Sequence, residues 1–343
     1  MRVCADPEGQ PPTTDEPTTG HWPPASPMVA TRKTVVVALG GNALGPPGED
    51  VTIHDQFRFT RESLKSVVEL ARDGWRIAIV HGNGPQVGDE LLRNEMAAEV
   101  LPEQPLGVLV ASTAGWIGYM IQQSLQNSLR QAGVHRLVVT QITQVVVDPE
   151  APEMQDPTKY IGRGISEAQA ERLRDSSWLV RRDANGVLRR VVASPRPVET
   201  IEWNTIRRLV YRGVIVIAAG GGGVPVYWDP ELGLEGVDVV IDKDLAAAVL
   251  GSEIGASTLL ILTDVDAVYR DFGTEHATPL RRLSLREAEA MLETDQLGRG
   301  SMRPKVEAGI RFLRGGGRRA LIAQLDQGLA ALRGEAGTEI RTR

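Results

Sequence analysis

The sequence is poor in cysteine, in aromatic side chains and in excess positive charge. Cys4 is the only cysteine among 343 residues, which excludes an intrachain disulfide and a metal site built from several thiolates. Aromatic residues make up 4% of the chain, so we expect an aliphatic core. The 38 basic and 44 acidic residues leave a net charge of −6, which argues against a surface that binds nucleic acid or membranes. The scarcity of cysteine fits a reducing compartment, and we expect a cytoplasmic protein.

Long apolar segments are also lacking. The N-terminal residues include no apolar block of the kind that marks a secretory signal. Residues 104–129 carry no charge, but several polar side chains interrupt them, and their most apolar part, 108–121, is too short to span a bilayer. We interpret this stretch as a buried or interface helix.

Two regions stand apart in composition. Residues 1–31 hold seven of the 21 prolines and few apolar side chains, which predicts a disordered tail ahead of one folded domain over 32–343. Residues 148–200 are rich in proline, arginine and glutamate. Within them a turn signal at 183–186 separates the runs 178–180 and 187–192, which predicts a β-hairpin. We therefore expect a small inserted subdomain over about 148–200.

The rest of the chain alternates strand and helix patterns. Residues 34–39 and 75–80 are short aliphatic runs, and apolar side chains recur at helical spacing between them, from about 55 to 72. Strand, helix and strand in this order form a βαβ unit. The pattern returns, with further strands expected within 134–147, 213–219, 258–263 and 319–323 and helices at 244–251, 284–294 and 304–313. We expect an α/β fold with a mainly parallel central sheet.

Glycine-rich corners follow three of the expected strands. They are Gly40-Gly41-Asn42, Gly82-Asn83-Gly84 and the four glycines 220–223. In an open parallel sheet, ligands bind beyond the carboxyl ends of the strands, where glycines let backbone N–H groups approach an anion. Three such corners predict an anion site, and we interpret His81 beside them as structural. The P-loop and the G-x-G-x-x-G fingerprint are absent, which disfavours a Walker-type NTPase and a Rossmann dehydrogenase.

Lysine is rare, with five residues against 33 arginines, so each lysine hints that a compact ammonium is required. Lys243 follows Asp242, which suits a helix N-cap, and a lysine is electrostatically unfavourable at a helix N-terminus. Two explanations are open: an ion pair with Asp242 or Asp244, or a bound phosphate, which we favour. Lys305 lies at another expected helix start. Lys159 lies in the insertion, from which an arm could bring it over a ligand.

Eight segments from about residue 33 to 340 form a recognisable set. They are VVVALGGNA (35–43), HGNGPQVG (81–88), TQVVVDP (143–149), DPTK (156–159), GGGGVPV (220–226), VIDKDLA (240–246), LTDVDAVY (262–269) and GSMRPKVEA (300–308). Together they resemble the carbamate kinases of the amino-acid kinase superfamily. The resemblance implies a three-layer αβα sandwich with a small protruding subdomain, usually as a homodimer. It implies Mg²⁺-dependent, reversible phosphoryl transfer between carbamoyl phosphate with ADP and carbamate with ATP.

The resemblance also implies roles for individual residues. The implied catalytic residues are Lys159, Lys243, Asp244 and Lys305. The residues implied to bind the phosphoryl group and carbamate are Gly40, Gly41, Asn42, Gly82, Asn83, Gly221 and Gly222. The residues implied to bind the nucleotide are Lys243, Asp264, Asp266, Ala267, Val268, Tyr269, Met302 and Lys305. No metal ligand is expected from the protein, because Mg²⁺ can be held by phosphates and water.

Two segments depart from the family pattern. After its lysine the family typically continues Pro-Ile-Gly-Pro-Phe, whereas this chain has Tyr160-Ile-Gly-Arg-Gly164, and residues 271–276 also differ. A relative that phosphorylates another small carboxylate or phosphonate therefore stays an alternative, as does a nucleotide-binding sensor without turnover. Retention of all three motif lysines argues against the sensor.

Overall fold

The computed structural model describes most of the chain. The described residues are 33–40, 43–45, 51–174, 178–183, 185–294, 296–297 and 302–342. The tail expected at 1–31 lies outside them, as do Gly41 and Asn42. The disordered tail therefore stays a prediction. All described residues belong to one compact unit, Thr31–Arg343.

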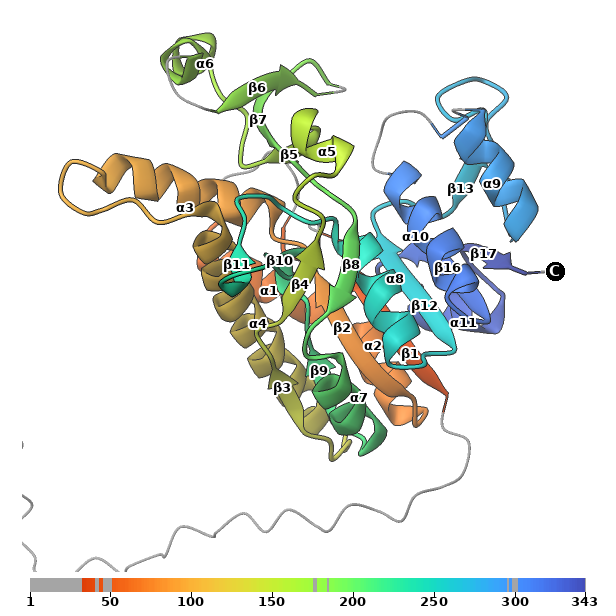
Figure 1. Ribbon diagram of the computed structural model, residues 1–343. Helices are drawn as coiled ribbons and strands as arrows, with labels where there is room; N and C mark the ends of the chain where they lie inside the picture. Colours follow the sequence, from red (N-terminus) through yellow and green to blue (C-terminus); the bar gives the residue numbers. More distant parts are fainter. Residues whose placement is uncertain are drawn as a thin grey trace, which may run out of the picture. The chain divides into compact units, whose positions relative to one another are not determined.

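An eight-stranded sheet forms the centre of this unit (Figure 1). Its strands lie in the order β15 (Arg282–Ser284), β17 (Thr338–Arg341), β16 (Arg319–Gln324), β12 (Thr258–Thr263), β1 (Thr34–Leu39), β2 (Arg76–His81), β9 (Ile215–Ile217) and β3 (Val138–Thr140). Every neighbouring pair is parallel except β16 with β17. The mainly parallel sheet expected from the sequence is confirmed.

Helices cover both faces of this sheet because its central strands are apolar on both sides. In β1, Val35 and Val37 point into one buried cluster, whereas Val36 and Ala38 point into another. Helices α2 (Lys65–Arg72), α4 (Leu106–Gln131) and α11 (Gly328–Arg333) pack on the first cluster. Helices α7 (Trp203–Tyr211), α8 (Lys243–Glu253), α9 (Leu285–Glu293) and α10 (Met302–Arg314) pack on the second. The expected three-layer sandwich is confirmed.

The helix α4 covers the uncharged stretch at 104–129. It buries Leu109, Ile117 and Leu125 among others, so the interpretation as a buried helix is confirmed. Among the helices of the described residues, none is long and apolar enough to cross a membrane.

Two expected elements are each divided in the structure. The helix expected over 55–72 breaks at Leu64 into α1 (Ile53–Ser63) and α2. The segment 134–147 holds two strands rather than one, because the chain turns after β3, where Thr143 Oγ1 donates to the carbonyl of Gln141 at 2.9 Å.

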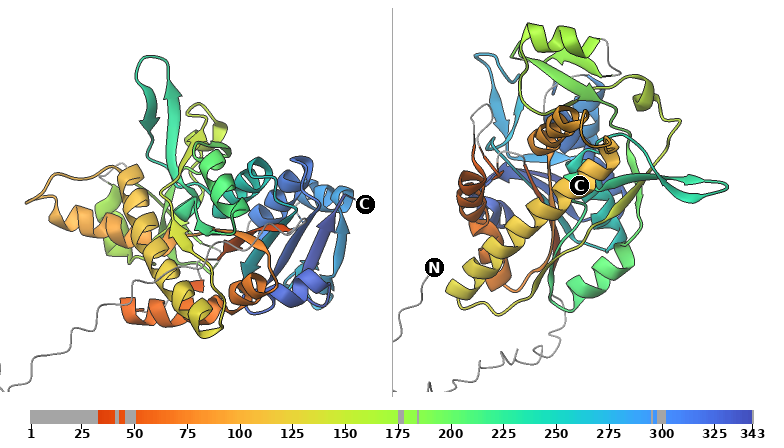
Figure 2. Two further views of the ribbon diagram at one scale, coloured as in Figure 1. Left: turned by 90° about the horizontal axis from the view of Figure 1, so that it is seen from below. Right: turned by 90° about the vertical axis from the view of Figure 1, so that its left-hand side faces the viewer.

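The second strand of the segment 134–147, β4, belongs to a separate four-stranded sheet. The order in this sheet is β11 (Gly233–Gly236), β10 (Val224–Asp229), β4 (Gln144–Val147) and β8 (Pro197–Thr200). Figure 2 shows the hairpin of β10 and β11, in teal, projecting from the unit. A two-stranded hairpin, β13 (Val268–Arg270) and β14 (Thr278–Leu280), lies after β12.

A three-stranded antiparallel sheet lies in residues 156–192, which we call the arm. Its order is β5 (Lys159–Ile161), β7 (Leu188–Val192) and β6 (Leu179–Arg182), and α6 (Glu167–Arg174) belongs to the same segment. The expected hairpin is confirmed, since β6 pairs with β7 and Asp183 Oδ1 accepts from the N–H of Val187 at 3.0 Å. A short helix, α5 (Pro152–Gln155), precedes the arm, and α3 (Gly84–Ala97) lies beside β5. The subdomain boundaries at about 148–200 stay a prediction.

Candidate active site

The glycine corners lie together at one edge of the main sheet. Gly40 follows β1 and donates its N–H to the carbonyl of Leu262 in β12 at 3.0 Å. Gly82 follows β2 and donates to the carbonyl of Leu39 at 3.3 Å. The third corner follows β9 as the short 3₁₀ helix η2 (Gly220–Gly222). Because β12, β1, β2 and β9 are successive parallel neighbours, their carboxyl ends meet, as the sequence predicts.

Steric contacts explain why glycine occupies the third corner. Gly221 has φ of +71°, and a Cβ there would lie 2.4 Å from the Asn83 amide nitrogen. Gly222 has φ of +94°, and a Cβ there would lie 2.3 Å from the carbonyl oxygen of Ile241. Asn83 is itself held by a bond from its Nδ2 to Thr113 Oγ1 at 2.9 Å. Because Gly221 and Gly222 have no side chains, Asn83 of the second corner and Ile241 before α8 can lie directly against the third corner.

His81 has a structural environment, as interpreted from the sequence. Its side chain is buried, its Nδ1 lies 3.0 Å from the carbonyl of Gly82, and a Cβ on Gly220 would lie 2.6 Å from its Nε2. Burial lowers the pKa of His81 to about 4, so the imidazole is neutral at pH 7. A neutral, enclosed imidazole suits packing between two corners.

The first turn of α8 carries the polar centre of the site. Asp242 is the N-cap, as expected, and its Oδ1 accepts from the N–H of Asp244 at 2.9 Å. Its other oxygen, Oδ2, accepts from Lys159 Nζ at 2.5 Å. One carboxylate therefore starts the helix and also holds the lysine of the arm.

Asp244 binds the other two lysines. Its Oδ1 accepts from Lys243 Nζ at 2.7 Å, and its Oδ2 accepts from Lys305 Nζ at 3.1 Å. Lys305 is the fourth residue of α10, so Asp244 joins α8 to the start of α10. We call Lys159, Asp242, Lys243, Asp244 and Lys305 the lysine cluster.

Within the lysine cluster, the lysines and aspartates stabilise one another in their charged forms. Burial by itself would raise the pKa of both aspartates, but the lysines outweigh burial and hold the pKa of Asp242 and of Asp244 below its usual range. Burial lowers the pKa of Lys243, with Asp244 acting against it. Burial also opposes the charge of Lys305, yet Asp244 and Asp242 raise the pKa of Lys305 above its usual value. Three ammonium groups face two carboxylates, which leaves one positive charge available to an anion.

The structure bears on both explanations for Lys243. The ion pair with Asp244 is present, and the bound phosphate stays a prediction. Sequence reasoning considered Asp242 as a helix N-cap and as a possible ion-pair partner of Lys243, and it missed the contact of Asp242 with Lys159. The Asp-Lys-Asp order showed that two carboxylates lie near Lys243. It did not indicate which lysine each carboxylate binds.

The residues implied to bind the nucleotide lie after β12 and at the start of α10. Asp264 accepts from Thr263 Oγ1 at 2.9 Å, and its charge helps to raise the pKa of Lys305. Tyr269 donates its hydroxyl to Asp266 Oδ1 at 2.9 Å. The other members differ in exposure: Met302 is partly buried, whereas Ala267 and Val268 are fully buried.

Comparisons with known proteins identify the family of this chain. The chain matches the amino acid kinase family over residues 33–324. Carbamate kinase from Pyrococcus horikoshii is 45% identical over 309 residues, which cover 89% of this chain and 98% of that protein. Carbamate kinase from Clostridium perfringens is 43% identical over 311 residues, which cover 89% and 99%.

Solved structures show the same relationship. Carbamate kinase from Giardia lamblia bound to citric acid superposes with a TM-score of 0.86 at 36% identity, covering 91% of this chain and 99% of that chain. The same Giardia enzyme bound to AMP-PNP superposes with a TM-score of 0.83 at 36% identity, with the same coverage. The chain therefore belongs to the amino acid kinase family and is a phosphotransferase enzyme, similar to the carbamate kinases over nearly its whole length.

Proposed function

We propose that this enzyme transfers a phosphoryl group reversibly between carbamoyl phosphate with ADP and carbamate with ATP. The observation that carries the proposal is the lysine cluster. Three lysines from the arm, α8 and α10 converge on two adjacent carboxylates beside the glycine corners. The curated relatives with over 40% identity carry the name of this activity.

The chemistry of phosphoryl transfer matches what the cluster offers. The reaction needs the donor and acceptor oxygens in line and needs stabilisation of charge on the transferred group, without covalent catalysis. Compact ammonium groups supply such stabilisation, and they act most strongly where water is excluded. Lys243 and Lys305 are almost fully buried, so their charges are preorganised before a ligand arrives.

Each member of the cluster has a distinct proposed role. Lys243 stabilises the transferring phosphoryl group, and Lys305 contacts the nucleotide phosphates near Asp264. Lys159 contacts the phosphates from the arm. Asp244 orients Lys243 and Lys305, to which it is bonded. Asp242 holds Lys159 until an anion replaces it as a partner.

The glycine corners complete the proposed phosphoryl and carbamate site. Gly40, Gly82, Asn83, Gly221 and Gly222 line the edge where the sheet ends, and their proposed role is to let the phosphoryl group and carbamate approach the backbone closely. The N–H groups of Gly40, Gly82 and Gly222 are bonded to the carbonyls of Leu262, Leu39 and Ala219, so these glycines act by leaving space rather than as free donors. Gly41 and Asn42, which lie outside the described residues, have the same proposed role. Carbamate is already an anion, so no general base is required. The neutral His81 is consistent with this, because it is enclosed rather than directed at a ligand.

Mg²⁺ is proposed to accompany the nucleotide. In the part of the chain that the structure describes, no three acidic, histidine or cysteine side chains gather into a metal cage. This donor set fits a cation that is held mainly by phosphates and water, with Asp264 as a carboxylate outside the cluster that interacts with Lys305. When bound, the cation neutralises charge on the phosphates. Homodimer assembly is a further expectation from the resemblance, and a cytoplasmic location is an expectation from the scarcity of cysteine.

The altered segment after Lys159 does not change the groups that hold Lys159. Arg163, which replaces a family proline, pairs with Asp89 of α3 at 3.0 Å. Its guanidinium is thus engaged outside the lysine cluster. Arg163 therefore gives no reason to prefer another small acid. Carbamate remains the proposed acceptor.

The test is a coupled assay of ATP formation from carbamoyl phosphate and ADP. Acetyl phosphate run in its place distinguishes carbamate from another small carboxylate, and ADP formation from ATP with a phosphonate as acceptor tests that alternative. We expect rapid ATP formation with carbamoyl phosphate and a much lower rate in the other two assays. ATP formation from acetyl phosphate alone would overturn the proposed substrate, and nucleotide binding without turnover would indicate the sensor.

A further inference from the structure

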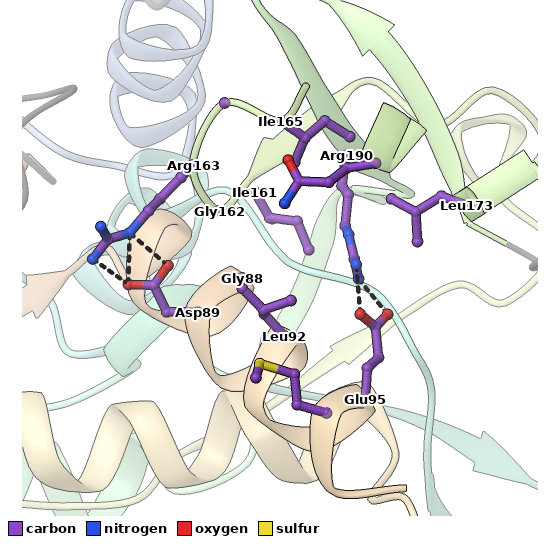
Figure 3. A pocket seen from close by; sticks show the side chains of 13 residues that line it. Gly88, Asp89, Leu92, Glu95, Ile161, Gly162, Arg163, Ile165, Leu173 and Arg190 are labelled. Carbon is purple, nitrogen blue, oxygen red and sulfur yellow. Dashed lines mark hydrogen bonds and ion pairs between the residues drawn. The ribbon is translucent and has the colours of Figure 1, made fainter. Parts of the chain in front are cut away.

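The arm that carries Lys159 meets α3 around a cavity, with a backbone contact and two ion pairs between the two elements (Figure 3). The cavity has a volume of about 530 Å³, and its walls include Gly88 and Leu92 of α3 and Ile161 of the arm. Because the arm and α3 are not fully packed at the cavity, the outer part of the arm depends on the contacts at the cavity's rim.

The inner contact joins backbone to backbone. Gly162 donates its N–H to the carbonyl of Gly84 at 2.9 Å, and a Cβ on Gly88 would lie 2.1 Å from Gly162 Cα. Gly162 is only three residues beyond Lys159. Beside it, Ile161 and Val192 of the arm pack with Val87 and Leu91 of α3 in one buried cluster, so the inner side of the arm is fixed to α3.

The outer contact is a bidentate ion pair between Arg190 and Glu95. Arg190 Nη1 and Nη2 donate to the two oxygens of Glu95, both at 2.5 Å. The Arg190 side chain is 9% exposed and its guanidinium lies 5.9 Å from the ring centre of Trp178. Arg190 is paired with Ile161 across β7 and β5, so it is rigidly connected to the strand that starts at Lys159.

The position of Glu95 in α3 is electrostatically unfavourable, and its ion pair with Arg190 offsets this cost. It lies in the last turn of α3, where the helix dipole disfavours a carboxylate. Arg190 supplies the compensating positive charge from the arm. The pair therefore couples the arm to the same helix that starts at the Asn83 corner.

A second ion pair between the arm and α3 is weaker. Arg163 binds Asp89, but the Arg163 side chain is 52% exposed. Solvent-exposed pairs contribute little, whereas removing one partner of a buried bidentate pair is costly. Of the two pairs, Arg190–Glu95 has the larger effect on the arm.

We propose that Arg190 and Glu95 are positioning residues: their ion pair holds the arm against α3 and sets where the Lys159 ammonium lies above α8. This inference rests on the proposed function, in which Lys159 contacts the phosphates. Without this pair the arm is held to α3 by its packed inner side and by the exposed Arg163–Asp89 pair, and a tilt of the arm about that side displaces Lys159 from the transferring group.

The test compares Arg190→Gln and Glu95→Gln with Arg163→Gln, which removes the exposed pair of the same two elements. We expect the first two to lower kcat by about 10- to 100-fold, since a displacement of one ångström can cost that much. The KM for ADP should change by less than about twofold, because the residues proposed to bind the nucleotide lie outside the arm apart from Lys159. Arg163→Gln should lower kcat by less than about threefold.

The decisive measurement repeats these substitutions in a Lys159→Ala background. There Arg190→Gln should lower kcat by less than about twofold further, because the group that it positions is gone. If Arg190→Gln lowers kcat by the same factor in both backgrounds, Arg190 does not act through Lys159 and the inference is overturned. If Lys159→Ala alone keeps normal turnover, the role proposed for Lys159 fails instead. Thermal unfolding checks each variant, and Glu95→Gln carries the test if Arg190→Gln does not fold.

Discussion

Asp244 and Lys305 lie 61 residues apart in the chain and form a buried ion pair, with 3.1 Å between Oδ2 and Nζ. Their side chains are 2% and 7% exposed, respectively. The second oxygen of Asp244 binds Lys243. A single carboxylate therefore pairs with two buried ammonium groups at the point where α8 meets α10.

Asp244→Asn should destabilise the fold, because it leaves two buried ammonium groups without their carboxylate. The loss in unfolding free energy should be about 3–5 kcal/mol, measured by denaturant unfolding. Inorganic phosphate should raise the Tm of this variant more than that of the wild type, since the anion can replace the lost charge. Asp156→Asn, which removes an exposed pair with Arg181, is the control and should cost less than about 1 kcal/mol. Equal stability of Asp244→Asn and the wild type would contradict the compensating role of Asp244.

Lys243→Ala should lower kcat because it removes a buried charge beside the proposed phosphoryl site. By analogy with the loss of one oxyanion donor, the effect should be on the order of 3–4 kcal/mol in the activation barrier, or about 10²–10³-fold. Lys65→Ala, in an exposed position on α2, is the control and should keep full turnover. Near-normal kcat for a folded Lys243→Ala variant would show that the role proposed for Lys243 is wrong.

Gly221→Ala should impair both folding and turnover, because a Cβ there meets the Asn83 amide at 2.4 Å. Gly186 has a similar φ, +78° against +71°, but nothing lies within 4 Å of its Cβ position. Gly186→Ala therefore measures the backbone strain alone, about 1–2 kcal/mol. Gly221→Ala should lose more stability by about 1–3 kcal/mol and should also lose activity. Equal losses in the two variants would mean that the contact with Asn83 has no energetic role.

Glu253→Gln should change how stability depends on pH. Burial raises the pKa of Glu253 from 4.5 to about 7, although its Oε1 accepts from the Thr200 N–H at 2.9 Å. Between these pH values the folded protein binds more protons than the unfolded chain, so stability falls as pH rises from 4.5 towards 7. The glutamine variant lacks this loss.

Urea unfolding at pH 5 and pH 8 measures the effect of Glu253. Relative to the wild type, Glu253→Gln should gain about 1–2 kcal/mol between the two pH values, after allowance for its partial exposure. Glu335→Gln, at an exposed position, should show no such gain. A constant difference between Glu253→Gln and the wild type across this range would refute the assignment.

Much of the fold could be predicted because its elements are local patterns. The aliphatic runs of β1, β2 and β12 and the helical spacing of α9 and α10 appear directly in the sequence. The parallel order followed from short βαβ units, and that order placed the glycine corners at one edge. The division of 134–147 into two strands was not predicted, because both halves have the same apolar pattern and only pairing with β9 and with β10 separates them.

The sequence by itself determined which groups are available to the site: scarce lysines, an Asp-Lys-Asp helix start and glycines after strands. Only the tertiary structure decided their partners. Lys159 binds Asp242 across 83 residues, and Arg190 binds Glu95 across 95. Such pairs form only where the arm, α3 and α8 meet in space, because electrostatic attraction depends on the distance between two charges and not on their separation along the sequence.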